Sequence, residues 1–284
     1  RRFFSPEEMN ALPDKKTVRQ TAFNSWESAA AIGPQALAEY KGMLDNLGQQ
    51  LGCSPGRGSP DEMSEADLDS DESFIFLGPL KKQEKSTDKV NTDYFGAWTQ
   101  LKDLVRATIA VRSIEDVHGA LDGLKRVGLN FAQKPKDNMT HGTKDGYRDL
   151  NLIVKLPQSG LLAELQIAVK QISKVKPEAH EYYNANIKLD QARKKQIAET
   201  SAPDGSGVAE GSRAYQSDNE DDINNWPDKA DFKQFMANRH KQQEIYGGAW
   251  AKVPGIDMIL KALRAAHGKL MLLFRQPVSM RNAA

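Results

Sequence analysis

Two runs of alternating apolar and polar residues constrain the fold of this 284-residue chain more than any other feature. They are GYRDLNLIVKL (146–156) and LLAELQIAV (161–169), joined by a turn at residues 157–160. Because successive side chains of a strand point to opposite faces, the runs predict a β-hairpin with one apolar face packed on a core. The other face then carries Tyr147, Asp149, Asn151, Glu164 and Gln166. Such a face is typical either of an ordinary solvated hairpin or of a polar site on a sheet.

The segments around the hairpin predict the rest of a sheet and its helices. DLVRATIAV (103–111) is rich in β-branched residues and predicts a strand. SIEDVHGALDGLKRVG (113–128) predicts a capped helix that ends at Gly128, and a further helix is expected over about 177–197. The order β-α-β-β-α favours an α/β (α+β) fold in which helices flank a mixed β-sheet.

Composition divides the chain into parts. Residues 53–73 and 199–225 are rich in Gly, Ser, Pro, Asp and Glu, which predicts an acidic flexible linker and a flexible acidic loop. They separate a helical N-terminal segment (1–52), a core (74–198) and C-terminal helices expected to pack on that core (226–284).

Helical periodicity supports the two outer parts. Apolar residues from Leu37 to Leu47 recur at a helical period, and Gly48 is expected to end that helix. Two further apolar stripes lie within 232–236 and 256–263. Core packing is the ordinary explanation of such stripes.

Charge and motif content exclude several classes of protein. The chain has 39 basic and 38 acidic residues, which argues against an evenly basic nucleic-acid coat but allows a local basic cleft. No run reaches about 18 apolar residues, so no membrane-spanning helix is predicted. The single cysteine, Cys53, lies in an acidic stretch that disfavours a reactive thiolate, and a P-loop and an HExxH motif are absent.

A second polar feature suggests a divalent cation beside a polyanion. Asp103 begins the predicted strand 103–111, and Glu164 lies on a neighbouring strand, so the two carboxylates could form a site for Mg²⁺, which prefers one or two carboxylates plus substrate phosphates. Lys81, Lys85 and Lys89 follow at four-residue spacing in a predicted helix over 79–91 and would share one face. A solvated basic helix is the alternative explanation of this row.

Five sequence pieces together resemble the RelA/SpoT-type alarmone synthetase domain, in the branch found in toxins and secreted effectors. They lie within roughly 78–190: GPLKKQEKSTDK (78–89), DYFGAWTQLKDLVRATIAV (93–111), KPKDNMTHGTKDGYRDLNLIV (134–154), LLAELQI (161–167) and HEYYN (180–184). The resemblance implies a nucleotidyltransferase-like core. It also implies an enzyme that moves the β,γ-diphosphate of ATP to the 3′-hydroxyl of a nucleotide, with Mg²⁺ as cofactor.

The resemblance assigns roles to individual residues. It implies that Asp103 and Glu164 bind magnesium and act in catalysis. It assigns the ATP phosphates to Lys81, Lys85, Lys89 and Arg106. It assigns the acceptor nucleotide to Tyr147, Asn151, Gln166 and His180, with Tyr147 stacking on the base. Two residues depart from the family pattern, since Arg106 stands where glycine is usual and Lys85 where arginine is usual in this branch.

The implied partners are ATP and an acceptor, which is GDP or GTP, ADP or ATP, or the 3′ end of a tRNA. A growth-inhibiting role, with a cognate immunity or antitoxin protein, would place the chain in the bacterial cytoplasm or, after delivery, in that of a target cell. The alternatives are a tRNA 3′-end pyrophosphokinase toxin and a catalytically silent module that binds nucleotide or RNA.

Overall fold

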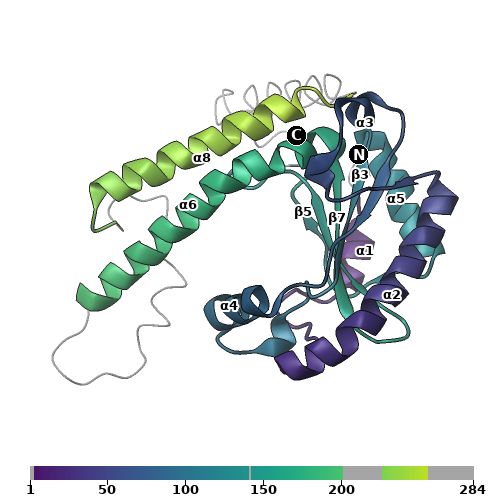
Figure 1. Cartoon of the computed structure of the whole chain (residues 1–284), viewed down its shortest axis with the longest axis horizontal. Helices are drawn as coiled ribbons and strands as arrows, with labels where there is room; N and C mark the ends of the chain where they lie inside the picture. Colours follow the sequence, from purple (N-terminus) through teal and green to yellow (C-terminus); the bar gives the residue numbers. More distant parts are fainter. Residues whose placement is uncertain (1–2, 141, 201–225, 255–284) are drawn as a thin grey trace, which may run out of the picture.

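The computed structural model describes residues 3–140, 142–200 and 226–254. Most of the predicted acidic loop 199–225 and the apolar stripe within 256–263 lie outside these residues. Within the described part, a twisted mixed β-sheet stands at the centre, and helices flank it (Figure 1). The predicted fold class is therefore confirmed.

The strands of the described residues form one seven-stranded sheet in the order β1-β2-β3-β7-β6-β4, with β5 also paired to β6. Their bounds are Ser54–Pro55 (β1), Phe74–Leu77 (β2), Arg106–Val111 (β3), Asn130–Phe131 (β4), Lys136–Asp137 (β5), Leu150–Lys155 (β6) and Leu162–Val169 (β7). β3 pairs with β7 in parallel, and β6 pairs with β7 in antiparallel. The predicted hairpin is therefore present, with Gly160 at φ +67° in its turn, a conformation that glycine adopts without strain.

Helices cover the sheet and extend beyond it. Their bounds are Pro6–Ala11 (α1), Trp26–Leu51 (α2), Glu65–Asp69 (α3), Gln83–Tyr94 (α4), Ile114–Arg126 (α5), Lys170–Thr200 (α6) and Lys229–Trp250 (α8), with 3-10 turns at Pro60–Glu62 (η1) and Trp98–Gln100 (η2). α2 and α5 pack on one face of the sheet, while α6 contacts η1 and the ends of β3 and β7. α6 and α8 lie side by side and project away from the sheet (Figure 1).

The apolar side of the hairpin forms the core, as its alternation predicts. Leu150, Leu152, Leu165 and Ile167 are fully buried. They belong to one large cluster with the apolar residues of α2 and α5. Glu164, Gln166 and Asn151 alternate with these residues and therefore point to the opposite face of the sheet.

Three N-terminal side chains hold the hairpin from the core side. The amide of Gln20 exchanges two hydrogen bonds with the backbone of Leu162, at 3.2 and 3.3 Å. The carboxylate of Glu39 accepts the backbone N–H groups of Gln158 and Ser159 in the turn, at 2.6 and 2.9 Å. The buried Tyr40 hydroxyl donates to the carbonyl of Glu164 at 3.3 Å, so residues before position 52 belong to the same packed unit as the hairpin.

Several predicted helix ends are wrong. The first long helix does not stop at Gly48 but continues to Leu51, and Gly52 ends it in the left-handed conformation at φ +66°. Gly48 instead allows a close approach, because a Cβ there would lie 3.2 Å from the carbonyl oxygen of Cys53. The lysine-rich helix begins only at Gln83, so Lys81 precedes it. α6 begins at Lys170, well before the predicted start at 177.

Residues 53–73, which we call the strap, were predicted to be a flexible linker, but they fold against the sheet. The strap contains β1, η1 and α3, and its Met63 packs with Phe74 and Phe76 of β2. From the first turns of α6, Lys170 donates hydrogen bonds to the carbonyls of Asp67 and Ser70, and Lys174 donates to the carbonyl of Met63. The buried Lys170 and the half-buried Lys174 thus supply contacts that composition alone did not indicate.

The apolar stripe predicted within 232–236 is buried only in part. Phe235 is buried against Trp226, with ring centroids 5.0 Å apart, whereas Met236 is exposed. No helix among the described residues is long and apolar enough to cross a membrane.

Candidate functional site

The polar face of the sheet brings chemically active side chains from three strands into register. Arg106 of β3 pairs with Glu164 of β7, and Thr108 pairs with Gln166. Across the antiparallel hairpin, Asn151 of β6 pairs with Gln166. Residues paired across neighbouring strands lie on the same face. The sequence therefore placed Glu164, Gln166 and Asn151 correctly, while Tyr147 and Asp149 precede β6 instead of lying on it.

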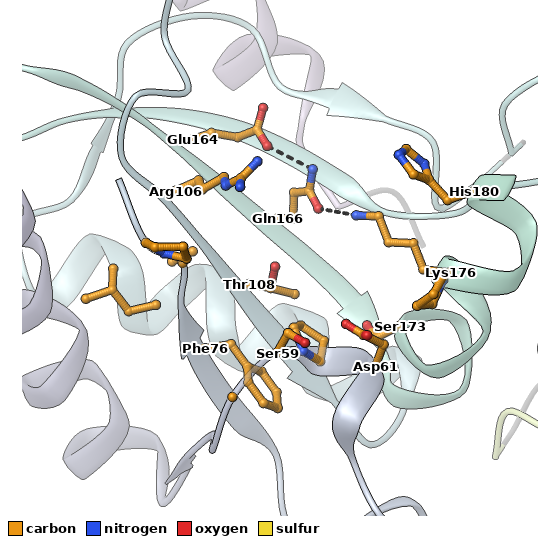
Figure 2. A pocket seen from close by; sticks show the side chains of 17 residues that line it. Ser59, Asp61, Phe76, Arg106, Thr108, Glu164, Gln166, Ser173, Lys176 and His180 are labelled. Carbon is orange, nitrogen blue, oxygen red and sulfur yellow. Dashed lines mark hydrogen bonds between the residues drawn. The ribbon is translucent and has the colours of Figure 1, made fainter. Parts of the chain in front are cut away.

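A cavity of about 380 Å³ lies on this polar face, between the sheet, the strap and α6 (Figure 2). The sheet contributes Phe76, Arg106, Thr108, Glu164 and Gln166, the strap contributes Ser59 and Asp61, and α6 contributes Ser173, Lys176 and His180. Of the predicted site residues, the cavity thus gathers Arg106, Glu164, Gln166 and His180.

A chain of two hydrogen bonds crosses the cavity from the sheet to α6 (Figure 2). The amide nitrogen of Gln166 donates to Oε1 of Glu164 at 2.9 Å. Nζ of Lys176 donates to Oε1 of Gln166 at 2.9 Å and to the Tyr147 hydroxyl at 3.3 Å. Burial lowers the pKa of Lys176, and Asp149 and Glu164 only partly offset that effect.

Asp103 does not begin β3 as predicted but lies three residues before it, in contact with two lysines. Its Oδ2 accepts hydrogen bonds from Lys81 Nζ at 2.6 Å and from Lys89 Nζ at 2.7 Å. Its Oδ1 is buried and has no hydrogen-bond partner among the described residues. Burial raises the pKa of Asp103, but Lys89 and Lys81 outweigh that effect, so the net pKa is lowered and the carboxylate is charged at neutral pH.

Asp103 and Glu164 belong to the same end of the paired strands β3 and β7. The backbone N–H of Glu164 donates to the carbonyl of Val105, two residues after Asp103, at 3.0 Å. Burial lowers the pKa of Lys89, but Asp103 and then Glu164 raise it, and the net pKa is raised. The ammonium group of Lys89 therefore interacts electrostatically with both carboxylates, although Asp103 itself does not line the cavity.

Asp103 and Glu164 are two carboxylates near this cavity that could hold a hard cation. Asp103 Oδ1 is a buried carboxylate oxygen that lacks a partner among the described residues, and such an atom suits a divalent ion better than an apolar environment. No group of three or more His, Cys, Asp or Glu residues in the described part could hold a metal by itself. Magnesium does not need such a group when substrate phosphates complete its shell.

Of the remaining predicted site residues, His180 borders the cavity, whereas Lys85 and Tyr147 do not. Lys85 is exposed on α4 and makes no contact with Asp103, so it is not part of the lysine pair. Tyr147 does not line the cavity, because its ring contacts Tyr246 of α8 at 5.4 Å between centroids and lies under Lys176. His180 borders the cavity and stacks on Tyr183, with centroids 5.2 Å apart. Burial and then Lys176 lower the pKa of His180, which favours its neutral form.

Sequence reasoning missed the strap residues Ser59 and Asp61, because the strap was predicted to be solvated. Lys170 and Lys174 do not line the cavity but donate hydrogen bonds to strap carbonyls. Burial and then Asp116 raise the pKa of the Cys53 thiol to about 11, which favours its protonated form at neutral pH.

No family model and no curated protein matches the chain. Three solved structures illustrate what its fold is similar to. The complex of the Type VI effector Tas1 with its immunity protein has 19% identity and a TM-score of 0.42, over 78% of this chain and 95% of that chain. A GTP pyrophosphokinase family protein from Streptococcus pneumoniae has 18% identity and a TM-score of 0.41, over 84% of this chain and 95% of that chain.

The third structure is the small alarmone synthetase 1 from Bacillus subtilis bound to its product pppGpp. It has 16% identity and a TM-score of 0.43, over 86% of this chain and 98% of that chain. The sequence motifs described above resemble the same class, the alarmone synthetases with their effector branch.

Proposed function

We propose that the chain is an ATP-dependent pyrophosphokinase that transfers the β,γ-diphosphate of ATP to the 3′-hydroxyl of a purine nucleotide. The observation that carries the proposal is Asp103, a buried carboxylate with two lysines on one oxygen and a second oxygen without a partner among the described residues. In a cluster whose side chains satisfied all of one another's hydrogen bonds, Oδ1 of Asp103 would have a partner. A bound cation with a polyphosphate would supply that missing partner.

The donor phosphates are proposed to lie against Lys81, Lys89 and Arg106. These side chains come from the segment before α4, from α4 and from β3, and burial of the two lysines strengthens their field on an anion. In phosphoryl transfer, positioning and charge neutralisation supply most of the rate enhancement. Lys85, which the motif resemblance also assigns to the phosphates, would reach them only from its exposed position on α4.

Magnesium fits this site through Asp103 Oδ1 and the carboxylate of Glu164. When bound, a divalent ion neutralises phosphate charge and polarises the reacting phosphorus. Glu164 has one oxygen engaged by Gln166, so its other oxygen is the one proposed to serve as a metal ligand or to accept the proton of the acceptor hydroxyl.

The 3′-oxygen of the acceptor forms a bond to the β-phosphorus of ATP, and the bond from that phosphorus to the α,β-bridging oxygen breaks. AMP leaves with the bridging oxygen, and the hydroxyl proton passes to Glu164 or to solvent. The cavity beside Glu164 is the proposed place of the acceptor. The stacking role of Tyr147 stays a prediction.

Labelled ATP with a panel of acceptors tests this function. The purified chain is incubated with γ-labelled ATP, Mg²⁺ and each of GDP, GTP, ADP, ATP and tRNA, and the products are identified by mass spectrometry. Diphosphate on one acceptor and AMP in equal amount are expected. Glu164→Gln should abolish transfer while leaving the thermal unfolding midpoint unchanged. Glu115→Gln removes an exposed carboxylate from α5 and should change neither quantity.

Two results would contradict the proposal. Undiminished turnover by Glu164→Gln would remove Glu164 from the reaction. Binding of nucleotides without transfer to any acceptor would instead favour a silent binding module. The toxin role implied by the motifs is tested separately, since expression in bacteria should arrest growth with the wild-type chain and not with Glu164→Gln, and a co-expressed immunity protein should restore growth.

A further inference from the structure

Lys176 occupies an unusual place for a lysine that borders a cavity. Its Nζ lies within hydrogen-bond distance of Gln166 Oε1 at 2.9 Å and of the Tyr147 hydroxyl at 3.3 Å, and 5.0 Å from the centroid of the Tyr147 ring. An ammonium group has three donors and no acceptor. Two of those donors are therefore directed at other side chains of the protein, not at the open cavity.

The contact with Lys176 determines how the amide of Gln166 is oriented. Because the ammonium can only donate, it requires the carbonyl oxygen of Gln166 on its side. The amide nitrogen then faces Glu164 and donates to its Oε1 at 2.9 Å. The reversed amide would place N–H groups against the ammonium and an oxygen against the carboxylate, which is unfavourable at both ends.

Glu164 and Gln166 are two residues apart on β7, so their side chains stand next to each other on the same face of the sheet (Figure 2). A fixed amide therefore restrains one carboxylate oxygen of Glu164 and leaves the other for chemistry. Lys176 belongs to α6, so the restraint also couples this helix to the strand that carries Glu164.

We propose that Lys176 is a positioning residue that orients Glu164 through the amide of Gln166, and that it does not bind a substrate phosphate. This inference rests on the proposed function, because it assigns Lys176 a part in the transfer reaction. A phosphate-binding lysine would be expected to direct its donors into the cavity. The two hydrogen bonds direct two of them to Gln166 and Tyr147 instead.

A double-mutant cycle tests whether Lys176 acts through Gln166. The cycle compares the wild type with Lys176→Met, Gln166→Met and the double variant, in steady-state kinetics with ATP and the acceptor. Loss of a residue that orients a catalytic group typically costs about 10- to 100-fold in activity. We expect that loss in kcat for Lys176→Met, with both KM values changed less than about twofold, and a double variant no worse than the poorer single variant.

Two controls accompany the cycle. Lys176→Arg retains donors and charge and should recover at least part of kcat. Lys188→Met removes an exposed lysine from the same helix and should leave the kinetics unchanged. A rise in KM at constant kcat would overturn the inference, because it indicates a direct contact between Lys176 and substrate. Losses that multiply in the double variant would also overturn it, because they show that Lys176 does not act through Gln166.

A substrate-free measurement separates this inference from the proposed function. Urea unfolding of the same four proteins should show a non-additive effect of the two substitutions on stability, since both break the same hydrogen bond. Additive effects on unfolding would refute the network even if the enzyme is active. If the wild type transfers diphosphate to no acceptor, the proposed function and the role of Lys176 in it are both refuted. A non-additive unfolding result would then show only that the network itself exists.

Discussion

Lys170 gives the sharpest test of why the strap is ordered. Its side chain is fully buried, and its Nζ donates to the carbonyls of Asp67 at 2.6 Å and Ser70 at 2.7 Å and to the Ser70 hydroxyl at 3.2 Å. Lys170→Met keeps most of the side-chain volume and removes all three bonds. The strap should then lose its principal attachment to α6.

The magnitude follows from these contacts. Hydrogen bonds to a charged group contribute about 1.5–3 kcal/mol each, so the two short bonds to carbonyls contribute about 3–6 kcal/mol. Removing the buried ammonium returns several kcal/mol of desolvation cost. The net loss expected for Lys170→Met is therefore about 1–3 kcal/mol. At about 2–4 °C per kcal/mol for a domain of this size, the unfolding midpoint should fall by roughly 2–12 °C.

Hydrogen exchange measured by mass spectrometry locates the effect. Amides of the strap should exchange faster in Lys170→Met, while those of β3, β6 and β7 should keep their wild-type protection. The control Lys188→Met removes the same charge from an exposed position on α6 and should change neither protection nor midpoint. Wild-type exchange in the strap of Lys170→Met would refute the reasoning, because it would mean that apolar contacts such as those of Met63 suffice.

Three further predictions concern packing and charge. Gly56→Ala should destabilise the fold by about 1–3 kcal/mol, because the new Cβ would lie 2.2 Å from the buried Phe76 ring. Gly42→Ala is the control: the new Cβ meets open space, so the variant should be more stable by up to about 1 kcal/mol. Urea unfolding of both variants measures these free energies. Asp103→Asn should lower the free energy of unfolding by about 3–5 kcal/mol at pH 7 in the same assay, because Lys81 and Lys89 lose their negative partner. An unchanged free energy of unfolding would contradict this prediction. Burial lowers the pKa of Lys102 from 10.5 to about 8. Between pH 8 and 10 the unfolded chain therefore binds more protons than the folded chain, so the stability of the fold should rise with pH over this range. Lys102→Met should flatten that rise in thermal melts.

The hairpin could be predicted from sequence because its signal is local. Alternation along 146–156 and 161–169 assigns each side chain to a face before any partner is known. The polar face with Glu164 and Gln166 followed from the same alternation, and the structure places both on the cavity.

The strap could not be predicted, because its order depends on residues about 100 positions away. Its own composition is that of solvated chain, and the buried ammonium of Lys170 is not distinguishable in sequence from an exposed one. The same limit applies to the lysine row. Spacing grouped Lys81, Lys85 and Lys89, whereas contact with Asp103 selects Lys81 and Lys89 and omits Lys85.

Gly48 and Lys176 show two other limits. A glycine inside a helical pattern can mark a stop or a close approach, and only the position of Cys53 decides between them. The position of Lys176 could not be predicted, because its ammonium donates to Gln166 and Tyr147, which tertiary structure alone brings together.

The attachment of Gln20, Glu39 and Tyr40 to the hairpin has a consequence for how the polar face of the sheet is assembled. These contacts join residues 119 to 142 positions apart, so the strand that carries Glu164 is completed only after the N-terminal segment has docked. Contacts of such separation slow folding. A fragment that starts at residue 74 would retain every motif residue yet leave the backbone of Leu162 without its glutamine partner, so the motif residues are fewer than those the hairpin needs to be fully packed.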